Sequence, residues 1–111
     1  MEHVPAAEYA VVADGKIKGY LLSTEHPFGR FKAQFFLEFG FRVDAWIELQ
    51  ESLLRHVLEN RVVESEATEF GTKYVVEGPL VSPDGRNPGV RTVWVIDPGE
   101  QRPRFVTAYP I

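Results

Sequence analysis

The spacing of apolar residues in the first half of the chain follows a helical period. In one segment they recur every three or four residues, as on one buried helix face: Trp46, Ile47, Leu53, Leu54, Val57 and Leu58. Asp44 precedes this segment and is a favourable N-cap, so we expect a helix over residues 44–60. Pro27 suits the first turn of a helix and Gly40 suits a left-handed helix end, so an earlier helix is predicted over residues 27–39.

In the second half the pattern becomes that of β-strands. Four segments are rich in Val, Thr and aromatic residues, which favour strands: residues 61–68, 72–81, 90–97 and 104–109. Gly, Pro and Asp residues separate them, and each connection is short enough to join antiparallel neighbours. The sequence therefore predicts an α+β fold, a single domain over residues 1–111 with two N-terminal helices packed on one face of a four-stranded antiparallel meander sheet. The other face would be open to solvent or to a ligand.

The N-terminal region carries weaker signals. Residues 10–22 contain a short apolar run, an Asp14-Gly15 turn signal and the segment KIKGYLL, which together fit a short strand or a single helical turn. Both alternatives stay open. Residues 1–9 are expected to form a poorly ordered N-terminus.

The composition narrows the class of protein. Of the 111 residues, 44% are hydrophobic and 25% are charged, as in an ordinary globular domain. No apolar run approaches the roughly 18 residues of a membrane span, and the first residues lack the pattern of a secretion signal, so a cytoplasmic protein with no membrane segment is expected. The absence of cysteine excludes disulfides, thiol nucleophiles and cysteine zinc sites. The three histidines are scattered, so neither a metal centre nor a cofactor is predicted.

The charge balance and the motifs bear on the substrate class. The 12 basic and 16 acidic residues give a net charge of −4, which counts against tight, unspecific nucleic-acid binding but permits a small local basic site. The chain has no P-loop, no G-x-G-x-x-G, no H-E-x-x-H and no G-x-S-x-G motif. Nucleotide-binding and hydrolase templates therefore gain no support.

A lysine falls among the aromatic residues of the first predicted helix. On a wheel of about 100° per residue, one stripe holds five aromatic residues: Phe28, Phe31, Phe35, Phe36 and Phe39. Lys32 lies inside this stripe, although a buried, unpaired ammonium is costly. Three interpretations stay open: the ammonium snorkels at the edge of the stripe, it is held at the helix–sheet seam and directed at an anion, or it makes a cation–π contact with a neighbouring Phe.

His26 lies at the start of the same helix. Helix N-termini attract anions, so His26, with Arg30 one turn further on, could act as an acid or base beside a bound phosphate. The alternative is an exposed loop histidine without a chemical role. His3 and His56 are assigned no role.

The predicted strands alternate without a clean division into apolar and polar faces. Thr107 and Tyr109 supply hydroxyl groups, and Lys73 and Arg91 supply cations. Such a mixture suits a surface that stacks bases and holds phosphates. It also suits an ordinary sheet, because Thr and Tyr favour strands in any case.

Four segments carry a resemblance to a small bacterial domain family with no assigned activity. They are HPFGRFKA at residues 26–33, FGTKYVVEG at 70–78, RTVW at 91–94 and RFVTAYP at 104–110. The match spans nearly everything after residue 15. In its layout of two helices and four strands, the chain also resembles the barnase–EndoU–colicin–RelE superfamily of metal-independent ribonuclease toxins.

The wider resemblance implies RNA cleavage through attack of a 2′-hydroxyl on the adjacent phosphorus, which requires proton transfer and charge stabilisation. It implies His26 as the acid or base, with Lys32 and Lys73 stabilising the developing charge. It further implies catalytic roles for Thr107 and Tyr109 in orienting the phosphate. The residues implied to bind the substrate are Arg30, Arg91 and Thr92.

Two hypotheses of function follow. The first is a toxin-type, metal-independent ribonuclease of a bacterial toxin–antitoxin or similar system, with RNA as substrate and an antitoxin or immunity protein as partner. The second is a non-enzymatic protein-binding module, either an immunity- or antitoxin-like subunit or a catalytically dead relative. A homodimer is compatible with both. The acidic charge and the expected exposed aromatic residues favour the second hypothesis, and the combination of His26, Lys32 and Lys73 favours the first.

Overall fold

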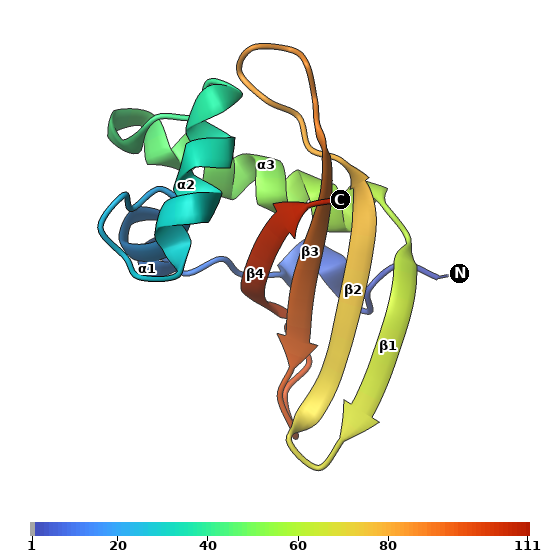
Figure 1. Ribbon diagram of the computed structural model, residues 1–111. Helices are drawn as coiled ribbons and strands as arrows, with labels where there is room; N and C mark the ends of the chain where they lie inside the picture. The colour runs from blue at the N-terminus through green and yellow to red at the C-terminus, as the bar shows by residue number, and fades with distance from the viewer. Residues whose placement is uncertain (1) are drawn as a thin grey trace.

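The computed structural model describes residues 2–111 and confirms the predicted α+β fold (Figure 1). Helical segments come first and a β-sheet follows. The helical elements are η1 (Ala7–Tyr9), α1 (Asp14–Lys16), η2 (Ile17–Leu21), α2 (Gly29–Glu38), η3 (Val43–Ala45) and α3 (Trp46–Glu59). The strands are β1 (Val62–Thr68), β2 (Gly71–Pro79), β3 (Gly89–Ile96) and β4 (Arg104–Pro110).

The four strands form a meander in the order β1-β2-β3-β4, with every neighbouring pair antiparallel. Residues paired across such strands project to the same face. One face carries Tyr74, Val76, Thr92 and Trp94, which belong to the core or line it. The other face, called here the second face, carries the alternate residues: Lys73, Val75, Glu77, Arg91, Val93, Thr107 and Tyr109.

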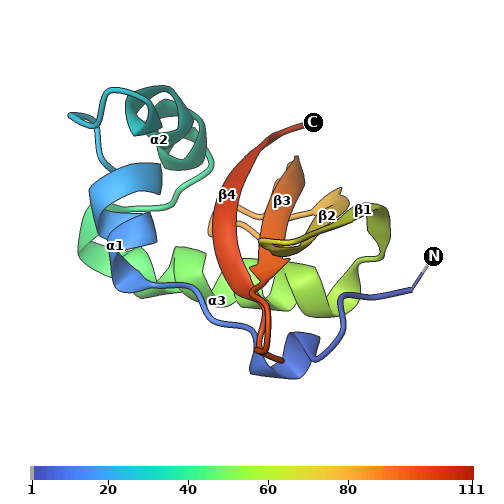
Figure 2. The ribbon, with the colours of Figure 1, turned by 90° about the horizontal axis from the view of Figure 1, so that it is seen from below.

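The two longer helices occupy different positions around the sheet. Helix α3 crosses the first face and contacts β2 and β3, burying Leu49, Leu53 and Val57 (Figures 1 and 2). Helix α2 lies beside β4 in both views and contacts η2 and β4. The sheet edge at β4 is therefore the place where helical side chains meet the second face.

The N-terminal segment combines both of the structures that the sequence left open. Val11 forms an isolated parallel bridge with Arg104, and the chain then becomes helical over α1 and η2. Ahead of it, Val4 and Ala7 are buried in the core. The apolar side chains of this segment face inward and hold it against the rest of the domain.

The buried face of α2 differs from the predicted aromatic stripe. Its buried residues are Gly29, Ala33 and Phe36, whereas Phe28 and Phe31 are 76% and 64% exposed. A Cβ atom at Gly29 would lie 2.2 Å from the carbonyl oxygen of Tyr20, so a glycine is required for the close approach of α2 to η2. The small residue Gly29 therefore makes the close contact with η2, and Phe36 fills the core further along the helix.

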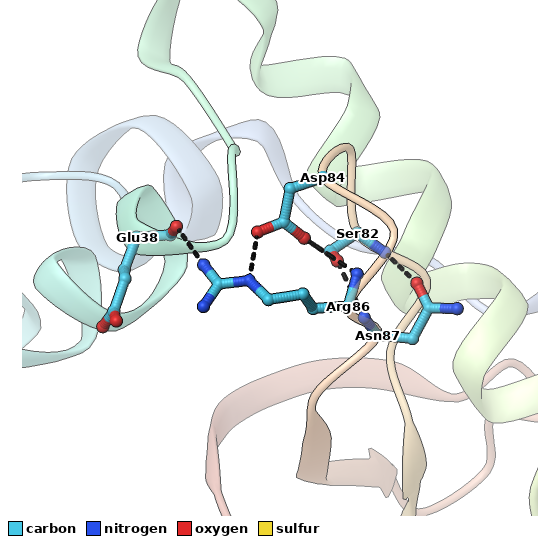
Figure 3. Close-up of polar contacts among 5 residues, drawn as sticks. All are labelled: Glu38, Ser82, Asp84, Arg86 and Asn87. Atoms are coloured by element: carbon cyan, nitrogen blue, oxygen red, sulfur yellow. Dashed lines mark hydrogen bonds and ion pairs between the residues drawn. The ribbon is translucent and has the colours of Figure 1, made fainter.

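The loop between β2 and β3 fixes the C-terminal end of α2 (Figure 3). The Arg86 guanidinium donates a hydrogen bond of 2.8 Å to the Glu38 carbonyl oxygen and pairs with Asp84 at 2.6 Å. It also lies over the Phe39 ring, 4.3 Å from its centroid. Within the loop, Asp84 accepts a hydrogen bond from the Ser82 hydroxyl, so the carboxylate that orients Arg86 is itself held in place.

Candidate functional site

A chain of side-chain hydrogen bonds joins α2, η2 and β4. The Lys32 ammonium donates to the Tyr20 hydroxyl over 2.6 Å, and that hydroxyl lies 3.1 Å from Oγ1 of Thr107, with either oxygen able to donate. All three side chains are half-buried. Of the three interpretations of Lys32, the structure shows the lysine held at the helix–sheet seam, with its cation–π contact made to Tyr20 rather than to a Phe.

The hydrogen bonds and charges around Tyr20 change the pKa of its phenol. Burial raises its pKa, but the hydrogen bonds with Lys32 and Thr107 and the charges of Lys32 and Lys16 outweigh this effect and lower the pKa below its ordinary value. The Lys16 ammonium contributes from 5.7 Å above the ring. Tyr20 therefore releases its proton more readily than a phenol in water.

The Lys32 ammonium is available to bind an anion. In the part of the chain that the structure describes, the ion pairs formed by Arg42, Arg55, Arg86, Arg91 and Arg104 do not involve Lys32. No carboxylate therefore neutralises its ammonium within residues 2–111. The two remaining N–H groups can face a negatively charged ligand.

His26 packs against the same tyrosine and caps α2. Its ring lies edge-on to the Tyr20 ring, with centroids 5.0 Å apart. Its Nδ1 accepts hydrogen bonds from the backbone N–H groups of Phe28 and Gly29, at 3.0 and 2.9 Å. Since Nδ1 is the acceptor, a neutral His26 carries its hydrogen on Nε2. The structure thus leaves Nε2–H as the group that His26 can offer to a ligand.

Arg91 and Tyr109 lie side by side on the second face, one row away from Thr107. The Arg91 guanidinium pairs with Glu77 at 2.6 Å and lies 5.9 Å from the centroid of the Tyr109 ring. The Tyr109 hydroxyl and the Glu77 carboxylate raise the pKa of Arg91. Arg91 is therefore permanently charged, but an internal carboxylate already balances part of that charge.

Three other residues from the sequence-based set lie outside this cluster. Lys73 pairs in register with Glu66 and Val95, so two strand spacings, about 10 Å, separate its backbone from β4. Arg30 is exposed, with its guanidinium 4.8 Å from the Phe31 ring centroid. Thr92 is 0% exposed, which leaves no surface on which a substrate could contact it.

Thr92 instead belongs to a buried network that includes His56. Trp94 Nε1 donates to Thr92 Oγ1 over 2.8 Å, and this hydroxyl lies 3.0 Å from His56 Nδ1. His56 Nε2 lies 3.1 Å from the carbonyl oxygens of Gly78 and Val90. Burial lowers the pKa of His56 despite these two carbonyls. The network therefore holds a neutral histidine in the core and has a structural role.

Sequence reasoning missed Tyr20, the centre of the cluster. Tyr20 falls in the segment whose structure the pattern left open, so no partner could be assigned to it. His56 could have been found, because it lies three residues after Leu53 and seven after Leu49 and so shares their helix face.

Two general features of residues 2–111 complete the description. No group of three or more His, Cys, Asp or Glu side chains in this range is arranged to hold a metal ion. None of the described helices is both long enough and apolar enough to cross a membrane.

Comparisons with known proteins give one family and one fold. A model of the family described as "Domain of unknown function (DUF6883)" matches residues 3–111. No curated protein sequence matches the chain. Among solved structures, a chain of the contact-dependent growth inhibition toxin–immunity protein complex from Klebsiella pneumoniae 342 is similar, with a TM-score of 0.73 and 18% sequence identity. The match covers 94% of this chain and 95% of that one, so the two share a fold over nearly their whole length.

Proposed function

Since the chain belongs to the DUF6883 family, whose function is unknown, we propose its activity from the site itself: a toxin-type, metal-independent endoribonuclease of a bacterial toxin–antitoxin or similar system. The observation that carries this proposal is the contact of Lys32 with Tyr20 and of Tyr20 with Thr107 at the β4 edge of the sheet. A cation that forms no ion pair within residues 2–111, a phenol and a hydroxyl are there held together beside a histidine.

The shared fold supports placement in a toxin system. The similar solved structure comes from a complex of a growth-inhibition toxin with its immunity protein. A toxin-type ribonuclease requires a neutralising partner in the cell that makes it, so an immunity or antitoxin protein is the proposed partner of this chain.

The proposed reaction is transesterification of RNA. A bond forms between the 2′-oxygen and the adjacent phosphorus, and the bond from phosphorus to the 5′-oxygen breaks. One proton leaves the 2′-hydroxyl and another reaches the leaving 5′-oxygen, so the step is balanced without a co-reactant. It yields a 2′,3′-cyclic phosphate and a free 5′-hydroxyl.

The four clustered residues can be given separate parts in this step. Tyr20 would exchange a proton with the reacting oxygens, because Lys32 donates to its oxygen and stabilises the phenolate, while Thr107 can accept from the phenol hydroxyl. Lys32 would offset the charge that develops on the phosphorane, and His26 would donate from Nε2–H to a non-bridging oxygen. Arg91 and Tyr109, one row away, would contact a neighbouring phosphate.

The test is RNA cleavage by the purified protein in the presence of EDTA. Wild type should produce fragments that end in 2′,3′-cyclic phosphate, and its induced expression should arrest growth. Tyr20→Phe and Lys32→Ala should each lower the rate by about 10²–10⁴-fold, the range for loss of a proton-transfer or charge-stabilising group. Lys18→Ala is the matched control, because Lys18 is exposed and its ammonium lies over Trp46 instead. Intact RNA after incubation with wild type would refute the proposal.

A second candidate is a non-enzymatic, partner-binding subunit, and strand β1 is the feature that favours it. β1 is an edge strand of the sheet, and Glu64 and Glu66 on it are exposed. An open acidic edge of this kind can accept a strand from a basic partner. This candidate function is supported if wild type leaves RNA intact but blocks growth inhibition by a co-expressed toxin.

A further inference from the structure

Two exposed phenylalanines lie directly beside the cluster around Tyr20. Phe28, the N-cap residue of α2, is 76% exposed, and Phe31, in the first turn of that helix, is 64% exposed. Exposed rings of this size leave apolar surface in contact with water, and such surface can mark a site for a ligand or partner. Their exposure beside the cluster therefore indicates a surface that binds a ligand or partner.

The contacts connect Phe28 to the proposed site in short steps, and Phe31 follows about one helical turn further on. Tyr20 and His26 have ring centroids 5.0 Å apart, and His26 and Phe28 have centroids 6.1 Å apart. The backbone N–H of Phe28 donates to His26 Nδ1, so the turn that positions the histidine also positions this ring. The Arg30 guanidinium lies 4.8 Å from the centroid of Phe31 and adds a positive charge to the same surface.

We propose that Phe28, Arg30 and Phe31 form a base-stacking platform for single-stranded RNA, next to the cleavage site. Aromatic rings with an adjacent arginine are the elements with which proteins hold unpaired bases, because every base offers a π-face and each nucleotide carries a phosphate. The inference rests on the proposed ribonuclease function and specifies its substrate as unpaired RNA. A base on Phe28 would place the following phosphate towards His26 and Lys32.

The platform predicts a binding signal that can be measured without cleavage. The probe is a short, fluorescently labelled, single-stranded oligonucleotide whose riboses are all 2′-O-methylated, so that no 2′-hydroxyl can attack. Phe28→Leu and Phe31→Leu should each weaken its binding about tenfold, since leucine keeps the apolar surface but cannot stack on a base. Phe28→Tyr should retain the affinity of wild type.

Phe70→Leu is the matched control. Phe70 is 78% exposed, and it lies in the turn between β1 and β2, at the end of the sheet remote from α2 (Figure 1). This variant should bind the probe as wild type does. A probe that lacks one base should lose affinity with wild type, and Phe28→Leu should cause little further loss with that probe, because the same contact is then already absent.

The outcomes separate the platform from the proposed activity. Equal affinity of wild type and both leucine variants would overturn the platform even if wild type cleaves RNA. Normal probe binding that depends on Phe28 and Phe31, together with intact natural RNA, would support the platform and refute the ribonuclease. If the leucine variants instead alter only the self-association of the protein in gel filtration, the surface is a protein contact and the proposal is wrong.

Discussion

Replacing Thr92 by Val tests the buried network beneath the sheet. The hydroxyl of Thr92 connects Trp94 Nε1 to His56 Nδ1, and all three side chains are at most 1% exposed. His56 Nε2 faces two carbonyl oxygens and must carry the hydrogen, so Nδ1 accepts from Thr92 while Thr92 accepts from Trp94. Valine has nearly the same shape, but it removes the hydroxyl that bonds to Trp94 Nε1 and to His56 Nδ1.

The expected loss follows from two buried polar groups left without a partner. Each such group costs about 1–3 kcal/mol, so the free energy of unfolding should fall by about 3 kcal/mol. The unfolding entropy is about 2.1 cal/mol/K per residue, so for 111 residues this loss corresponds to a decrease in Tm of roughly 13 °C.

Thermal and urea unfolding, followed by circular dichroism, measure this loss. Thr72→Val is the control, because Thr72 lies on the neighbouring strand β2 and is half-buried, and its replacement should change stability little. RNA cleavage per folded molecule should be unchanged in Thr92→Val well below its Tm. A decrease in Tm of under about 3 °C would refute the network argument, and a loss of cleavage without a loss of stability would restore Thr92 as a substrate residue.

Three further changes test the core histidine and the placement of α2. Because the pKa of His56 is lowered in the folded state, the unfolded state binds the proton more readily, so the free energy of unfolding should fall as the pH drops below about 6.5. Urea unfolding should show this slope flattened in His56→Gln, and an equal slope in wild type and variant would contradict the argument. Arg86→Ala should cost about 1 kcal/mol and speed amide hydrogen exchange in the last turn of α2, because its bond to that turn is lost. Gly29→Ala should move Tyr20, since its Cβ would lie 2.2 Å from the carbonyl oxygen of that residue. The rate of RNA cleavage by the folded variant should therefore fall, even well below its Tm, and equal rates for wild type and variant would contradict this.

The sheet could be predicted from the sequence almost residue by residue. The predicted strand over residues 90–97 compares with Gly89–Ile96, and the predicted strand over 104–109 with Arg104–Pro110. Local signals suffice here, because turn residues at both ends bound each strand and β-favouring residues fill it. Helix α3 was equally accessible, since its apolar period is continuous.

Helix α2 shows where local patterns stop being sufficient. A hydrophobic wheel assigns the core side to the largest apolar residues, but the contact with η2 is closer than a Phe side chain allows. Gly29, in the first turn, marks the face that packs against the backbone of Tyr20, and Ala33, four residues on, is also buried. Phe28 and Phe31 are therefore exposed, and no periodicity in a single sequence distinguishes such rings from core residues.

Local patterns in the sequence also identify one residue of the candidate site but not its partners. Lys32 could be singled out, because a charge next to a buried helix face is locally anomalous, and the structure places it at the helix–sheet seam. Its partners could not be found from spacing, because Tyr20 and Thr107 are 87 residues apart and meet only when η2 packs against β4. Lys73 has the right charge, but its register on β2 keeps its backbone two strands away.

The position of Lys32 depends on both ends of α2 at once. At the N-terminal end His26 accepts hydrogen bonds from the first turn, and at the C-terminal end Arg86 donates to the last turn from the β2–β3 loop. A helix of ten residues that is held at both ends has little freedom to rotate, so the lysine between them keeps its direction towards Tyr20. Because His26 caps α2 through Nδ1 and can donate to a ligand through Nε2, replacing this side chain would release the cap and disturb the site together. The fold of α2 and the chemistry at the β4 edge are therefore coupled through one imidazole ring.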